Sequence, residues 1–108
     1  MNWSILDNIN QLDELKKESF ENPVLIFKHS TRCGVSRMVL KQFENDFDYE
    51  NVLPYFLDLL EYRNISNEIA NVFGVVHQSP QILIIKNGIC VYDASHNLIE
   101  ANVIQKYL

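Results

Sequence analysis

The chain has 108 residues, 47% of them hydrophobic, and its 9 Lys and Arg against 14 Asp and Glu give a formal net charge of −5. This length and apolar content predict a single domain spanning residues 1–108, and the low content of 3 Gly and 3 Pro excludes disordered and collagen-like classes. The acidic balance argues against nucleic acid as a partner, and no apolar run approaches the roughly 18 residues of a membrane helix. Because the first residues also lack the order of a signal peptide, we expect a cytoplasmic protein without nucleic-acid or membrane partners.

Hydrophobic spacing predicts the first elements of the chain. Apolar residues at helical spacing predict a helix around residues 9–20, which Pro23 ends. The continuous apolar run 24–27 is typical of a strand covered on both faces. The polar residues 29–32 that follow are expected to form a loop.

The middle of the chain changes its period twice. A helix is expected to begin after Cys33-Gly34 and to stop near Glu44, because the acidic residues gathered there disfavour the end of a helix. Residues 52–59 are expected to form a second strand, in which Pro54 favours an early or an edge position. Residues 64–73 carry the apolar stripe of a third helix.

The last third of the chain predicts a hairpin followed by a helix. Gly74 is a plausible end of the preceding helix, and residues 81–85 and 89–92 read as strands. Asn87-Gly88 between them is a strong hairpin signal. Residues 98–108 have apolar side chains at helical spacing.

The predicted order is therefore α-β-α-β-α-β-β-α. A strand, helix and strand in this order form a right-handed crossover unit, and the closing hairpin adds antiparallel strands. The fold class that follows is α/β, with three α/β/α layers around a four-stranded mixed central sheet.

Positive charge is concentrated in one stretch. Residues 28–43 contain no Asp or Glu but four Lys and Arg, so this stretch carries +4 and the remainder −9. Chance clustering on a solvated face would give the same pattern. The alternative is a positive field that stabilises a thiolate and attracts an anionic ligand, because Cys33 lies within this basic stretch.

Cys33 is the candidate nucleophile. Two cysteines do not make a disulfide scaffold, and Cys33 is expected where a helix begins, where free backbone N–H groups and the helix dipole favour a thiolate. Arg32 and Arg37 add positive charge, and Gly34 allows the turn and leaves the sulfur open. Ser36 takes the place of the second sulfur of a Cys-x-x-Cys motif, so a mixed disulfide on Cys33 would wait for an external thiol. The Ser36 hydroxyl could bind the Cys33 sulfur or cap the turn.

Ser79-Pro80 before a strand is the second candidate element. Paired with an upstream strand, cysteine and helix, this proline is expected to be cis and to lie beside the reactive sulfur. The backbone of Ser79 could then pair with an extended ligand. A trans proline opening an edge strand is the alternative.

These residues carry a resemblance. Cys-x-x-Ser at a helix start, with Ser-Pro-Gln before a hairpin, resembles the thioredoxin superfamily, and the segments 27–33 and 74–81 resemble the monothiol bacilliredoxins, thioredoxin-fold proteins linked to the small thiol bacillithiol. The resemblance implies a thioredoxin-like domain without a bound cofactor, in which Cys33 removes bacillithiol from protein mixed disulfides. Bacillithiol is then the co-substrate, bacillithiolated proteins are the partners, and a bacillithiol disulfide reductase is a regenerating partner.

The same resemblance assigns roles to other residues. Arg32, Gly34 and Ser36 are expected to stabilise the thiolate. The cations of the basic stretch would meet the two carboxylates of the bacillithiol malate. The residues expected to contact the ligand are Lys28, Thr31, Arg37, His77, Ser79, Pro80 and Gln81.

Two alternatives stay open. Residues 33–37 resemble the Cys-Gly-Phe-Ser-Arg motif of monothiol glutaredoxins, which carry a [2Fe–2S] cluster with glutathione, although residues 91–95 lack their Gly-Gly-x-Asp turn. Gly34 also stands where the bacilliredoxins usually have Pro. The other alternative is a non-catalytic binding module of the thioredoxin fold.

The remaining candidates have simpler interpretations. Cys90 lies in an apolar strand and is expected to be a piece of the core. Asp58 is expected at a solvated strand end, although proton transfer is conceivable there. His29 and Cys33 fall short of a zinc site, so no metal is predicted.

Overall fold

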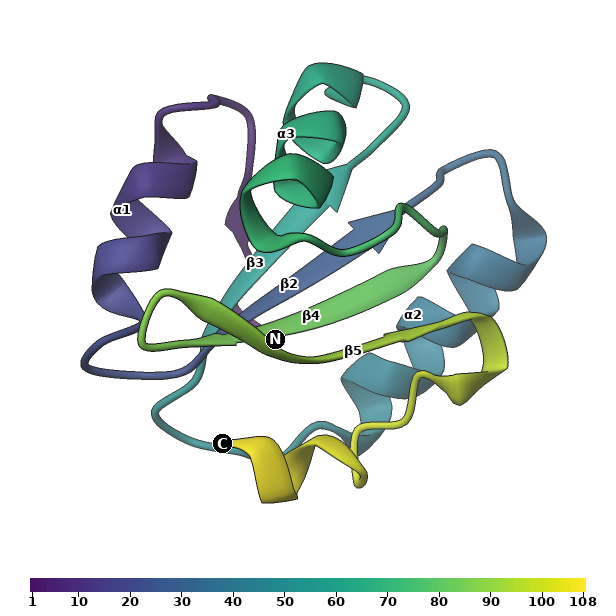
Figure 1. The fold of residues 1–108 in the computed structure, drawn as a ribbon. Helices are drawn as coiled ribbons and strands as arrows, with labels where there is room; N and C mark the ends of the chain where they lie inside the picture. Colours follow the sequence, from purple (N-terminus) through teal and green to yellow (C-terminus); the bar gives the residue numbers. More distant parts are fainter.

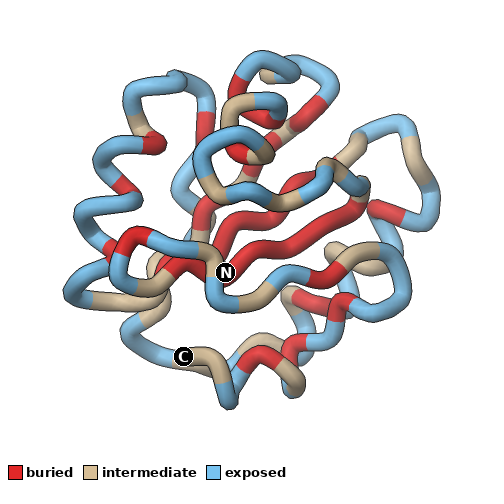
Figure 2. The backbone as a smooth tube through the Cα atoms, viewed as in Figure 1, coloured by how far each residue is buried: buried red, intermediate tan, exposed pale blue.

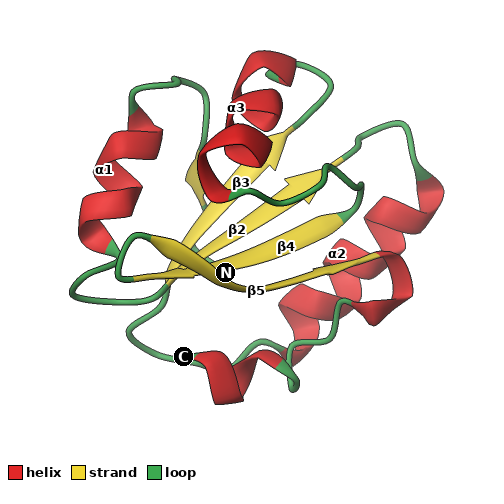
Figure 3. Ribbon diagram, in the orientation of Figure 1, coloured by secondary structure: helices red, strands yellow, loops and turns green.

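The computed structural model describes residues 1–108 and shows a five-stranded mixed sheet with helices on both faces (Figures 1 and 3). The strands are β1 (Ser4–Ile5), β2 (Val24–His29), β3 (Leu53–Asp58), β4 (Gln81–Lys86) and β5 (Ile89–Ser95). The helices are α1 (Gln11–Glu18), α2 (Gly34–Asp46), α3 (Arg63–Phe73) and the short 3₁₀ helices η1 (His96–Leu98) and η2 (Ile104–Tyr107). None of these helices has the length and apolar character that a membrane span requires.

The strands follow the order β1-β3-β2-β4-β5. β1, β3 and β2 run parallel, whereas β4 is antiparallel to β2 and β5 is antiparallel to β4. α1 and α3 cover one face of the sheet and α2 covers the other (Figure 1). The expected three-layer α/β/α architecture with a closing hairpin is therefore confirmed.

The prediction of four strands was wrong, because β1 adds a fifth. β1 has two residues, with Ser4 opposite Tyr55 and Ile5 opposite Phe56. The fully buried Leu6 extends the pairing through its N–H, which donates to the Phe56 carbonyl over 2.8 Å. A strand of this length is too short to show a period of two, so the sequence pattern could not reveal it.

The prediction of a C-terminal helix over residues 98–108 was also wrong. The chain instead forms η1 and η2 with turns between them. Ile99, Ala101 and Ile104 are the buried side chains here, and their spacing of two and three does not follow one face of an α-helix. Leu98, which the predicted apolar face includes, is 67% exposed.

Smaller differences concern the ends of elements. α2 runs to Asp46, beyond the expected end at Glu44, and β2 includes His29, which is buried rather than part of a loop. The predicted helix end is confirmed, since Gly74 has the left-handed φ of 64° that a residue without Cβ adopts most easily. The predicted turn is confirmed too, with φ of 53° at Asn87 and 79° at Gly88.

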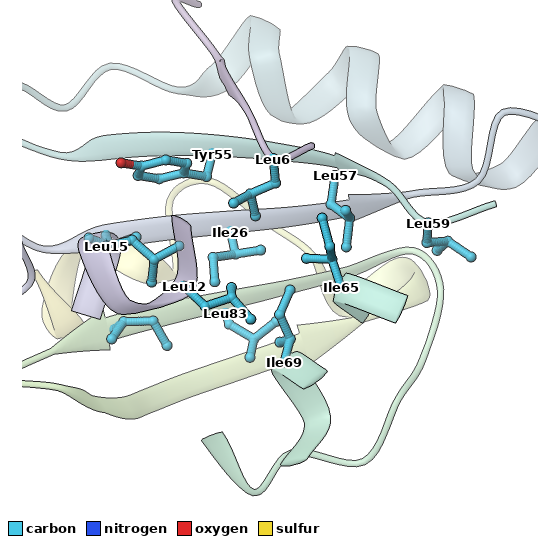
Figure 4. Packing of buried hydrophobic residues seen from close by; sticks show 12 residues of the cluster. Leu6, Leu12, Leu15, Ile26, Tyr55, Leu57, Leu59, Ile65, Ile69 and Leu83 are labelled. Atoms are coloured by element: carbon cyan, nitrogen blue, oxygen red, sulfur yellow. The ribbon is translucent and has the colours of Figure 1, made fainter. Parts of the chain in front are cut away.

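The central strands separate two apolar clusters, and they form the buried middle of the molecule (Figure 2). Val24 and Ile26 belong to the cluster on the side of α1 and α3. Figure 4 shows Ile26 of this cluster with Leu15 and Ile69. Leu25 and Phe27 alternate with them and pack on the α2 side. Burial of each such side chain stabilises the fold by about 1.5–3 kcal/mol, and burial on both faces explains why β2 is apolar without alternation.

The pairing of β4 with β5 contains one irregularity. Ile84 lies opposite Tyr92, but the next residue, Ile85, lies opposite Cys90. Val91 is therefore an extra residue in β5 and forms a β-bulge. β5 is an outer strand of the sheet, so this bulge interrupts one of its two edges.

Candidate functional site

The candidate site lies at one end of the sheet, which we call the Cys33 end. β2 ends there, and because β4 is antiparallel to β2, β4 begins there, with Lys28 opposite Gln81. β5 ends there as well, with Ser95 opposite Gln81. The topology thus brings together the loop before α2, the loop before β4 and the turn after β5 (Figure 1).

Cys33 begins α2, as predicted. It is the N-cap residue, with an extended backbone at φ −108° and ψ 118°, and its carbonyl accepts the Arg37 N–H over 3.1 Å. The Cys33 N–H donates to the Ser30 carbonyl over 3.2 Å, which closes the turn into the helix. Cys33 is half-buried and free of any disulfide, and it lies at the positive end of a 13-residue helix dipole.

Gly34 is not needed for the turn that the sequence interpretation assigned to it. Its φ lies outside the left-handed region, and a Cβ built on it would meet only the Arg37 guanidinium, at an ordinary 3.8 Å. The backbone at this position therefore accepts other residues. What Gly34 does provide is an exposed, uncovered position beside the half-buried Cys33.

Ser36 is fully buried and binds to the end of β2. Its Oγ accepts the Ser30 N–H over 3.1 Å and lies 2.8 Å from Nδ1 of His29. Of the two expected roles, the hydroxyl thus caps the turn, and its hydrogen bonds go to these two residues rather than to the Cys33 sulfur.

His29 is a site residue that the sequence interpretation considered only as a metal ligand. Its side chain is buried against the Phe56 ring. Burial lowers the pKa of His29, with the nearby Asp58 carboxylate acting in the opposite direction and Arg37 adding to the lowering. A neutral imidazole can accept a hydrogen bond at Nδ1 from the Ser36 hydroxyl, so His29 and Ser36 join β2 to the first turn of α2. The sequence signal that could have indicated this role is a histidine at the end of an apolar strand.

The Lys28 side chain is buried, whereas contact with a ligand would require it to be exposed. The sequence interpretation placed Lys28 and Gln81 against the ligand, but their side chains are 0% and 1% exposed. The Lys28 ammonium donates to Oε1 of Gln81 over 2.9 Å, underneath the loop before β4. Burial lowers the pKa of Lys28 to about 8. A lysine in a polar-looking segment is ordinarily solvent-exposed, which is why its burial was missed.

The loop before β4 contains the predicted cis peptide bond, between Ser79 and Pro80. The Ser79 hydroxyl oxygen is buried without a hydrogen-bond partner. The Pro80 carbonyl accepts the His96 N–H over 3.0 Å, which joins this loop to the turn after β5. His96, whose φ is 56°, was not singled out from the sequence, because a non-glycine residue in this conformation leaves no pattern.

His77 lies in the same loop and is half-buried. Its Nδ1 is 3.2 Å from the hydroxyl of the buried Ser66 in α3. Burial lowers the pKa of His77, and the charges of Lys28 and Arg63 lower it further. The structure thus places His77 at the Cys33 end of the sheet, with one ring nitrogen directed to α3.

Three residues expected at the site are exposed around the Cys33 loop: Thr31, Arg32 and Arg37. The Arg37 guanidinium donates to the Thr31 carbonyl over 3.0 Å and so supports the loop from outside. With Lys28 buried, the exposed cations of the basic stretch are Arg32, Arg37 and Lys41.

Cys90 and Asp58, the other cysteine and the candidate acid, have contacts that belong to the fold. Cys90 packs against the cluster beneath α1 and α3, as predicted for core, and burial raises its pKa to about 11. Asp58 is half-buried at the end of β3, where its Oδ1 accepts the Leu60 N–H over 3.2 Å. No group of three or more His, Cys, Asp or Glu side chains is gathered where it could hold a metal ion.

Comparison with known proteins agrees with this geometry. The family model of the monothiol bacilliredoxin BrxC matches residues 4–104. A solved thioredoxin-fold protein proposed to be an oxidoreductase is 27% identical, with a TM-score of 0.82, over 94% of this chain and 89% of that chain. Thioredoxins of Malassezia sympodialis and Plasmodium falciparum are 19% and 16% identical, with TM-scores of 0.75 and 0.74. The match covers 98% of this chain in both cases, and 87% and 98% of those chains, and it shows a shared fold.

Proposed function

Because this chain belongs to the monothiol bacilliredoxin BrxC family, we propose that it removes bacillithiol from protein mixed disulfides through Cys33. The family and the fold support a thiol oxidoreductase in general. The observation that carries the finer proposal is the half-buried Cys33 at the start of α2, with the buried Ser36 where the motif of a dithiol protein has its second cysteine.

The proposed reaction has two exchange steps. The Cys33 thiolate attacks the bacillithiol sulfur of the mixed disulfide, a bond forms between these two sulfurs, and the bond to the substrate protein breaks. The substrate sulfur leaves with the bonding electron pair and takes a proton from water. A second bacillithiol thiolate then attacks the bacillithiol sulfur on Cys33, which releases the Cys33 thiolate and forms bacillithiol disulfide.

The electrons balance across the cycle. The protein sulfur is reduced from the mixed disulfide to a thiol, and one free bacillithiol is oxidised, because it joins the bacillithiol removed from the substrate in bacillithiol disulfide. A bacillithiol disulfide reductase would then restore the small thiol. We place this cycle in the cytoplasm, where cysteines are kept reduced.

The residues around Cys33 suit an anionic ligand. The two malate carboxylates of bacillithiol would meet Arg32 and Arg37, whose guanidinium groups bind carboxylates through two parallel hydrogen bonds. The backbone of Ser79, next to Pro80, would pair with the extended part of the substrate. Thr31 and His77 are the other residues that contact the ligand in this proposal. Lys28 and Gln81 are buried, so they do not touch the ligand.

Exchange of each cysteine tests the proposal. Cys33→Ser should abolish the release of bacillithiol from a bacillithiolated protein, measured by mass spectrometry of the substrate. Cys90→Ser is the matched control and should keep most of the activity, because the Cys90 thiol is part of the core. Equal losses in the two variants would contradict the assignment. Brown protein with visible absorbance as purified would instead support an iron–sulfur carrier.

A further inference from the structure

Lys28 is a buried cation whose hydrogen-bond partner is neutral. Its side chain is 0% exposed, and its ammonium donates to the Gln81 amide oxygen over 2.9 Å. Lys28 lies between Leu57 of β3 and Gln81 of β4 in the sheet. Holding a charge in such surroundings costs several kcal/mol unless it is compensated. Its presence in the sheet therefore calls for a role other than stabilising the fold.

Gln81 connects Lys28 to the loop before β4. The same amide oxygen that accepts from Lys28 lies 3.4 Å from the Gln78 backbone nitrogen, which donates to it. The amide nitrogen of Gln81 donates to the Val76 carbonyl over 3.0 Å. Gln81 is itself 1% exposed, so one buried side chain binds the backbone of this loop at two places.

This loop, residues 75–80, is the part of the site that the buried pair can influence. It leaves α3 after Gly74, carries His77, and ends at the Ser79-Pro80 bond at the Cys33 end of the sheet. Val76 is 79% exposed, so little packing holds the outer part of the loop. Gln81 holds the backbone at Val76 and Gln78, whereas His77 contacts Ser66. The Pro80 carbonyl at the end of the loop accepts the His96 N–H. Lys28 fixes the orientation of the Gln81 amide, because an ammonium only donates and therefore faces the amide oxygen.

We propose that Lys28 is a positioning residue: through Gln81 it holds loop 75–80 in the shape that binds the mixed-disulfide substrate next to Cys33. This inference rests on the proposed function for its substrate, but the positioning of the loop is a property of the free protein. Lys28 acts on substrate binding and leaves the sulfur chemistry at Cys33 unchanged.

Lys28→Met separates positioning from stabilisation, because the two roles predict opposite signs. Methionine fills a similar volume without charge, and replacing a buried charge by an apolar side chain is often neutral or stabilising. We expect KM for a bacillithiolated protein to rise at least about five-fold, kcat to stay within about two-fold, and Tm to stay equal or rise. A purely structural lysine would lower Tm and leave KM unchanged, and that result would overturn the proposal.

Two further variants sharpen the test. Gln81→Met should raise KM as Lys28→Met does, and the double variant should be no worse than either single one, because both remove the same link. Additive losses would contradict the link through Gln81. Lys17→Met is the matched control, since Lys17 is an exposed lysine on α1, and it should leave KM and kcat unchanged.

Amide hydrogen exchange of the free protein keeps this inference independent of the substrate. Lys28→Met should speed exchange at residues 76–79 at least about ten-fold and leave β2 and β3 unchanged. If the wild-type protein releases no bacillithiol, the proposed function fails. The amide exchange rates of residues 76–79 in the wild type and in Lys28→Met then test by themselves whether Lys28 positions the loop. If the wild type is active and Lys28→Met changes neither KM nor exchange, the positioning role is refuted.

Discussion

Ser36 shows how one hydroxyl at the site serves the fold. Its Oγ accepts the Ser30 N–H and pairs with Nδ1 of His29, and all of these contacts are buried or half-buried. A buried polar group that loses its partner costs about 1–3 kcal/mol. Ser36 therefore belongs to the support of Cys33 rather than to the reacting groups.

Ser36→Ala should lower the free energy of unfolding by about 1–3 kcal/mol, because it leaves the Ser30 N–H and the His29 ring without their partner. Urea denaturation followed by circular dichroism measures this. Ser79→Ala is the matched control: the Ser79 hydroxyl is buried without a partner, so its removal should leave stability equal or higher. A similar loss of stability in both variants would contradict this assignment of hydrogen bonds.

At the scale of single residues, the sequence predicted which residues form the site better than it predicted where their side chains lie. Cys33 at the helix start, the cis bond before Pro80 and the core position of Cys90 are all found in the structure. Lys28 was misplaced because charge in a sequence carries no sign of which face of a strand it occupies. His96 was missed because its role comes from a backbone hydrogen bond that joins distant segments.

At the scale of elements, the first position of α2 can accept residues other than the glycine that stands there. Gly34 is the first helical residue, and the N–H at this position is one that a helix leaves unpaired. Cys33 before it has the extended backbone that a following proline requires. Proline is favoured at the first position of a helix for these reasons.

Gly34→Pro should therefore raise the free energy of unfolding by about 0.4–1 kcal/mol, since proline restricts the unfolded chain. Activity through Cys33 should be retained. Gly74→Ala is the control with the opposite sign, because alanine at a φ of 64° is strained by about 1–2 kcal/mol. Thermal or urea unfolding of both variants measures the difference, and destabilisation by Gly34→Pro would show that the turn does need glycine.

Long elements with a clear apolar period were predictable, and short ones were not. α3 and the β4–β5 hairpin lie where the period and the turn residues placed them. β1 has only two residues and so carries no strand period. The C-terminal segment does have apolar residues at helical spacing, but the residues it buries, Ile99, Ala101 and Ile104, follow a different and irregular spacing. Both are held by contacts with distant parts of the chain, which a local pattern cannot contain.

At the scale of the whole molecule, the buried cation makes stability depend on pH. Burial lowers the pKa of Lys28 from 10.5 to about 8. Between these values the unfolded chain binds more protons than the folded one, so the contribution of Lys28 to stability rises with pH. Below about pH 8 both states are protonated, and the full penalty of the buried charge is present.

Lys28→Met lacks this penalty and should be more stable than the wild type at pH 7 by on the order of 1–3 kcal/mol. The gap should narrow as the pH rises from about 8, the pKa of Lys28 in the folded wild type, towards 10.5, its ordinary pKa in the unfolded chain. Urea denaturation of both proteins at pH 7 and at about pH 10 measures the gap. Cys90, whose pKa burial raises, is present in both and cancels from the difference. A gap that widens with pH would refute this account.

The bulge at Val91 has a consequence for how copies of this protein meet. An outer strand offers unpaired backbone groups on which another chain can extend the sheet, and such growth leads to fibrils. In β5 the extra residue breaks the regular spacing of these groups, and the charged Asp93 follows it. The opposite edge, β1, is only two residues long. Both features disfavour the pairing of a further strand along these edges, which is the step by which a sheet grows from one copy to the next into a fibril.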